Sequence, residues 1–132
     1  MRLGLEYPEP RVDSAGLMLS VADEGIALPS GGVARMQEMR TDVFDGGMIL
    51  RFRYVSDDFD PQTGTADSVT EDLHHLCVTH SLPVLRMAGL SPKQVIISLA
   101  DQPGEFGVAD PEIKQVFEAF TIHGDRCIWE LF

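Results

Sequence analysis

The chain has 132 residues and a mass of 14.6 kDa, which suits one domain with a real hydrophobic core and leaves no room for a second. Ten Lys and Arg against 21 Asp and Glu give a formal net charge of -11. That charge repels polyphosphates and anionic lipid surfaces, so we exclude nucleic acid and membranes as partners. The apolar runs are also too short to span a bilayer.

The first 35 residues are rich in proline, glycine and acids, and we expect them to form an extended N-terminal arm around the core. Within it, GLMLSV (16–21) predicts one strand and PSGG (29–32) predicts a turn. Residues 36–132 are then expected to form a single α+β domain.

Alternating side chains in MILRFRYV (48–55) predict a strand with one buried face. The buried face carries Leu50, Phe52 and Tyr54, which leaves Arg51 and Arg53 exposed to solvent. A turn at Asp45-Gly46-Gly47 precedes this strand, so residues 36–55 are predicted to form a β-hairpin.

A helix is predicted next, with Asp67 or Ser68 as its N-cap. Its apolar stripe consists of Val69, Leu73, Leu76, Cys77 and His80. Pro83 lacks an amide hydrogen and clashes with the carbonyl four residues back, so we expect a break near Ser81 and a short second helix that ends at Gly89.

Three further strands are predicted at 94–100, 115–123 and 126–132, and Gly124-Asp125 joins the last two in a tight hairpin. The resulting fold class is α+β. An antiparallel sheet of four to five strands would carry the main helix and the short second helix on one face, because this arrangement buries both apolar surfaces.

The two cysteines are expected to point into the core. Cys77 lies on the helix stripe, and Cys127 shares a strand face with Trp129 and Leu131. A disulfide between them would close a loop of about fifty residues and is the favoured interpretation, with two free core thiols as the alternative. Structural disulfides persist in oxidising compartments, so this bond would place the protein in the periplasm or outside the cell.

Two other uses of DLHHLCVTH (72–80) are disfavoured. A metal site would need His74, Cys77 and His80 to converge, but residues six apart diverge around a helix and no fourth ligand is visible. A cysteine nucleophile with His80 as its base would need an oxyanion-binding loop, and none surrounds Cys77. We therefore expect no metal and no catalytic residues.

DDFDPQTGTAD (57–67) resembles a calcium loop only superficially. Thr63 stands where an EF-hand needs glycine, and Val69 stands where it needs a bidentate glutamate. An acidic, turn-rich connection to a capped helix explains this segment without an ion.

DQPGEFGVADPE (101–112) is the most unusual connection and supplies the candidate surface for a ligand or a protein partner. Its candidate residues are Asp101, Glu105, Phe106 and Asp110. The alternative is that Phe106 packs under its own loop. Common nucleotide-binding and hydrolase motifs are absent, so no cofactor is predicted.

Several strings resemble a family of small uncharacterised proteins from Rhodobacter-type alphaproteobacteria: LRFRYV, HLC followed by SLPVL, QVIISLADQPGEFGVADPE, QVFEAF and CIWELF. The resemblance covers residues 28–132 and implies no activity. Family members often begin with an export signal or a lipoprotein-like leader. The opening MRLGLEYPEPRVD has no apolar core of that kind, so we expect a protein that is not exported or one whose signal has been removed.

These observations predict a small acidic domain of an exported protein that binds a partner and has no enzymatic activity. The alternative is a small enzyme or metabolite-binding protein that uses Asp101 and Glu105 with Arg51 or Arg53 as a counter-charge. We expect a periplasmic or secreted location, with the cytoplasm as the alternative.

Overall fold

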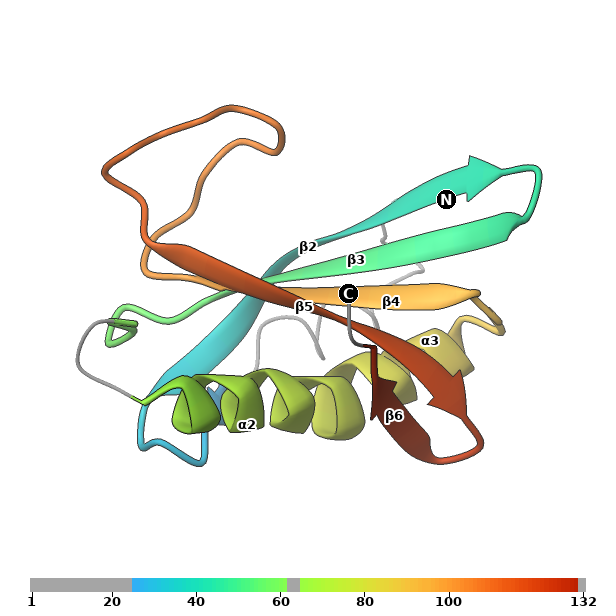
Figure 1. Cartoon of the computed structure of the whole chain (residues 1–132), viewed down its shortest axis with the longest axis horizontal. Helices are drawn as coiled ribbons and strands as arrows, with labels where there is room; N and C mark the ends of the chain where they lie inside the picture. The colour runs from blue at the N-terminus through green and yellow to red at the C-terminus, as the bar shows by residue number, and fades with distance from the viewer. Residues whose placement is uncertain (1–24, 62–64, 131–132) are drawn as a thin grey trace.

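The computed structural model describes residues 25–61 and 65–130, and the strand expected at 16–21 lies outside them. The described chain forms one sheet with a long helix lying along one of its faces (Figure 1). The sheet curls around this helix as a half-barrel. Among the described residues, no helix has both the length and the apolar character needed to cross a bilayer.

Within the described residues, the sheet has six strands, which lie side by side in chain order. Neighbouring strands are antiparallel except for β3 and β4, which run parallel. The strands are β1 (Ile26–Ala27), β2 (Val33–Phe44), β3 (Gly47–Val55), β4 (Gln94–Ala100), β5 (Gln115–His123) and β6 (Arg126–Trp129).

The prediction of an antiparallel sheet of four to five strands was therefore wrong. The sheet is mixed, because the chain leaves β3 at one end, returns through the helix, and enters β4 in the same direction. Two parallel neighbours require such a crossover, which is usually helical. The additional strand is the short β1, which pairs with the first residues of β2.

The helix is continuous for 22 residues, so the break expected near Ser81 was also wrong. It consists of α2 (Ala66–Leu76), the π-helical turn η1 (Cys77–Ser81) and α3 (Leu82–Met87). In η1 the amide of Leu82 donates to the carbonyl of Cys77, five residues back. This wider turn changes the bonding just before Pro83, whose missing amide would otherwise interrupt the helix. Gly89, with a φ of 70°, follows the end of α3.

The N-cap of the helix is Thr65, and neither Asp67 nor Ser68 takes that position. Thr65 Oγ1 accepts a hydrogen bond from the Ser68 amide at 3.0 Å, and Ser68 Oγ accepts one from the Thr65 amide at 3.1 Å. This reciprocal capping box satisfies the amides of Thr65 and Ser68 at the start of α2.

The predicted register of β3 is confirmed. Leu50, Phe52 and Tyr54 are buried beneath the helix with the inward-facing side chains of β4. Arg51 and Arg53 lie on the other face, but they are less exposed than predicted: their side chains retain 31% and 13% of their surface. The loop between β4 and β5 covers them.

Cys77 and Cys127 form a disulfide, which confirms the favoured interpretation. Their Cα atoms are 6.4 Å apart, and both residues are buried. The bond joins η1 to β6, so the last strand is covalently attached to the middle of the long helix.

Replacing both cysteines (Cys77→Ala with Cys127→Ala) should lower the free energy of unfolding by on the order of 4 kcal/mol, because the loop of 50 residues would no longer be closed in the unfolded chain. Chemical denaturation measures the change. A reductant should destabilise the native protein and leave the double variant unaffected. Two titratable thiols in denatured protein that was never reduced would contradict the disulfide.

Candidate functional site

The loop between β4 and β5 lies on the side of the sheet opposite α2 (Figure 1), and it contacts side chains of β2 and β3. The ring of Phe106 lies 4.2 Å from the guanidinium carbon of Arg40, and 5.6 Å and 5.5 Å from those of Arg51 and Arg53. The carbonyl of Gly104 accepts a hydrogen bond from Arg53 at 3.0 Å. Cation–π contacts therefore hold Phe106 against the arginines of the sheet.

Two of the predicted site acids hold the backbone of this loop. Asp101 accepts a hydrogen bond from the Lys114 amide at 3.0 Å, and Asp110 accepts one from the Glu112 amide at 3.0 Å. Glu105 is exposed, and Phe106 keeps 40% of its surface. The binding of a ligand or a partner by this loop stays a prediction.

A buried polar cluster joins β3 to the π-helical turn. The Tyr54 hydroxyl lies 2.8 Å from His80 Nδ1 and 2.6 Å from Ser81 Oγ. Burial raises the pKa of the Tyr54 hydroxyl far above its ordinary value of 10.0, while the hydrogen bond with Ser81 acts in the opposite direction. The three residues are only 1%, 6% and 0% exposed, so the cluster is out of reach of a substrate.

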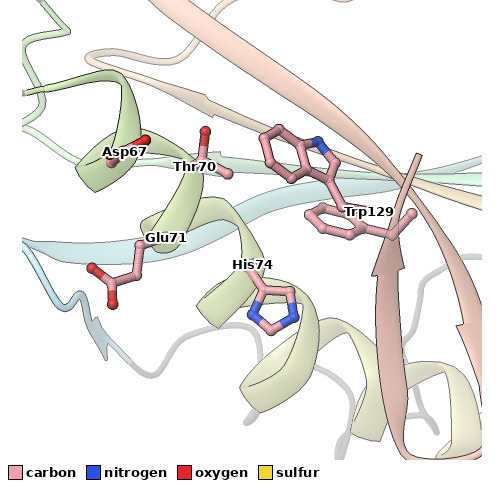
Figure 2. A pocket seen from close by; sticks show the side chains of 6 residues that line it. Asp67, Thr70, Glu71, His74 and Trp129 are labelled. Atoms are coloured by element: carbon pink, nitrogen blue, oxygen red, sulfur yellow. The ribbon is translucent and has the colours of Figure 1, made fainter. Parts of the chain in front are cut away.

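A groove lies between α2 and the final hairpin and has a volume of about 390 Å³ (Figure 2). One side of α2 contributes residues at helical spacing, and the sheet contributes two aromatic rings. The lining residues are Asp67, Thr70, Glu71, His74, Phe120 and Trp129. Thr70 projects toward Trp129, whereas the Glu71 carboxylate extends to the other side of α2 (Figure 2).

The Trp129 indole forms the aromatic wall of this groove and is 45% exposed. Its Nε1 donates a hydrogen bond to Glu118 Oε2 at 2.6 Å, which fixes the ring with a carboxylate at its edge. Strand alternation places Trp129 on the same face as Cys127, whose disulfide fixes the strand to the helix. The wall is therefore held in place before any ligand arrives.

His74 connects the two sides of the groove. Its Nε2 lies 3.2 Å from the carbonyl oxygen of Cys127, an atom that can only accept, so Nε2 carries the hydrogen. The imidazole also lies against the buried Phe120, with ring centroids 5.9 Å apart. These contacts give His74 a positioning role at the base of the groove.

The three residues that a metal site in the helix would need each have a different contact. The Cys77 sulfur is in the disulfide, His80 contacts Tyr54, and His74 contacts Cys127. Within residues 25–61 and 65–130, no three His, Cys, Asp or Glu side chains come together as a potential metal site.

Sequence reasoning missed the groove because its two sides are more than forty residues apart in the chain. The helical spacing of Asp67, Thr70 and His74 was visible, but only the crossover brings that side of α2 toward β6. The one available signal was Trp129, an aromatic residue at the end of a short strand.

The model of a family of unknown function, DUF6497, matches residues 12–132. No curated protein and no solved structure matches the chain.

The buried phenol predicts a pH dependence of stability that Tyr54→Phe should remove. Because the pKa of Tyr54 is raised in the folded protein, its stabilising contribution is complete below pH 10.0 and is lost as the pH rises above that value. The loss should reach up to about 1.4 kcal/mol per pH unit. Chemical denaturation between about pH 8 and pH 11 should show a steeper decline for the native protein than for the variant. Parallel declines would contradict the role of the phenol.

Proposed function

The chain belongs to the DUF6497 family of unknown function, and we propose that it is a non-enzymatic binding domain of an exported protein whose groove between α2 and β6 binds a cationic side chain of a partner protein. The observation that carries the proposal is the half-exposed Trp129, held in place beside carboxylates in an open groove.

The chemistry of the groove favours a cation. An indole face attracts a lysine or arginine side chain through its negative quadrupole. Asp67 adds formal negative charge from α2, and Glu118 adds a second carboxylate at the edge of the indole. None of the described residues that line the groove is Lys or Arg.

The charge of the whole chain supports the same partner. A net charge of -11 attracts basic molecules at long range and accelerates their encounter with an acidic groove. The basic residues near Phe106 do not compete with the partner for the carboxylates of the groove, because they are already engaged by that ring and by Glu38 and Asp42.

A binding role, as opposed to catalysis, is supported by the position of the reactive groups. A hydroxyl or imidazole that acts on a substrate must reach it at hydrogen-bond distance. Tyr54, His80 and Ser81 are enclosed in the core, and His74 is committed to a backbone carbonyl. The groove instead offers an aromatic face and carboxylates.

An exported location is supported by the disulfide, because structural disulfides persist in the periplasm and outside the cell and are rare in a reducing cytosol. The resemblance to proteins of Rhodobacter-type alphaproteobacteria, which often carry a leader, favours the periplasm. Expression of the epitope-tagged full-length gene product in bacterial cells, followed by cell fractionation, tests this placement. Recovery of the protein in the cytosolic fraction alone would contradict it.

Trp129 is the only tryptophan of the chain, so its fluorescence reports directly on the groove. Titration with a lysine-rich peptide should change the emission, and the same peptide with acetylated lysines should not. Asp67→Asn should weaken binding about twofold to fivefold, as expected for a contribution of about 0.5 to 1 kcal/mol from one exposed charge. Glu71→Gln should have a smaller effect, because the Glu71 carboxylate extends to the other side of α2.

Asp45→Asn is the matched control, because it removes one negative charge from an exposed turn at the tip of the β2–β3 hairpin. It should leave the affinity nearly unchanged. If all three variants weaken binding equally, the peptide is responding to net charge alone and the groove is not its site.

A further inference from the structure

A second hollow lies at the N-terminal end of α2 and shares no lining residue with the groove. It has a volume of about 630 Å³ and is bounded by the turn that joins β1 to β2, by the end of β3 and by the first turns of the helix. The residues that carry its chemistry are Ser30, Gly32, Ser56, Asp58, Asp60 and Asp72.

Ser56 is the unusual member of this set. It is only 1% exposed, and within the described residues its hydroxyl has no hydrogen-bond partner. A buried hydroxyl without a partner destabilises a protein, so such groups usually have a ligand or an ordered water. Because Ser56 also lines the hollow, its hydroxyl is placed to bind whatever enters.

Gly32 leaves the space beside this hydroxyl open. A Cβ atom at position 32 would stand 3.3 Å from Ser56 Oγ and 3.6 Å from Cβ of Asp58. Any side chain there would therefore crowd the serine. The glycine keeps the space beside Ser56 Oγ free of a side chain.

Asp72 supplies a buried carboxylate on the helix side, with 3% of its surface exposed. One of its oxygens accepts a hydrogen bond from the Ser30 amide at 3.1 Å, and the other accepts one from Ser30 Oγ at 2.5 Å. A carboxylate has about four acceptor positions, so these two bonds leave capacity for further donors.

The charged groups around the hollow disfavour the binding of an anion. Asp58 and Asp60 line the hollow, and although Asp60 lies 3.7 Å from Lys114 Nζ, none of the described lining residues is basic. At the helix end, the Ser68 amide is already used by the capping box and is not available to an anion. A ligand must bring hydrogen-bond donors and positive charge.

We propose that this hollow binds a small molecule with a primary ammonium group. An ammonium has three donors, which suit the Asp72 carboxylate, the Ser56 hydroxyl and one of the other carboxylates. The hollow is within the range of about 300 to 1,000 Å³ that is usual for small-molecule sites. The site is distinct from the groove at Trp129 and does not depend on the function proposed for it.

Amide NMR spectra of the full chain, titrated with ethanolamine, test the proposal. Ethylene glycol and glycolate replace the ammonium by a neutral hydroxyl and by a carboxylate, so they isolate the charge. Ethanolamine should shift the amides of Gly31, Gly32, Ser56 and Asp72, and the other two compounds should not. A separate titration with calcium chloride examines the competing possibility of a metal ion.

Two variants make the test specific. Ser56→Ala should weaken ethanolamine binding about tenfold without lowering the melting temperature, because the hydroxyl has no partner to lose within the protein. Gly32→Ala should weaken it similarly by crowding Ser56. Ser98→Ala, on the outer face of β4, is the matched control and should bind as the native protein does.

Loss of the shifts in the Ser56 and Gly32 variants, with retention in the Ser98 variant, would support the site. The proposal is overturned if ethanolamine causes no shifts, if ethylene glycol causes the same shifts, or if Ser56→Ala binds unchanged. Saturable binding of calcium without binding of ethanolamine would also overturn it. A fluorescence change of Trp129 alone would report on the groove, so the two sites remain distinguishable.

Discussion

The parallel pairing of β3 and β4 is the constraint on which the other features depend. Because both strands run in the same direction, the connection must return from the end of β3 to the opposite end of the sheet, where β4 begins. The long helix provides this return. The helix buries one apolar face against the inward-facing side chains of the sheet. Its two ends are thereby fixed at opposite ends of the sheet, which places the hollow beside Ser56 at the N-terminal end of the helix and the disulfide at its middle.

Local patterns were sufficient to predict most of the elements. The alternation in β3, β4 and β5 and the turn at Gly124 identified those strands, because a side-chain period of two is a property of each strand alone. The disulfide could also be predicted, since helix and strand periodicity independently placed both cysteines on inward faces. The strand directions could not, because the same alternating pattern suits parallel and antiparallel neighbours.

The candidate sites were harder to predict, for a related reason. The hollow joins Ser30 to Asp72, which are 42 positions apart, and the groove joins α2 to β6. Only tertiary packing brings such residues together. The loop around Phe106 was noticed because its composition is unusual, but its aromatic ring contacts arginines from β2 and β3 that lie more than fifty residues earlier in the chain. An unusual composition is therefore equally compatible with a loop that packs on the sheet and with a loop that binds a partner.

The covalent link between η1 and β6 also has a mechanical consequence. The ring closed by Cys77 and Cys127 contains α3, β4, β5 and most of the final hairpin. A force that pulls on the two ends of the chain cannot extend the 50 residues of this ring while the bond is intact. At about 3.4 Å per extended residue, the bond withholds on the order of 170 Å of length. Under tension, the oxidised protein is therefore a much shorter tether than its reduced form.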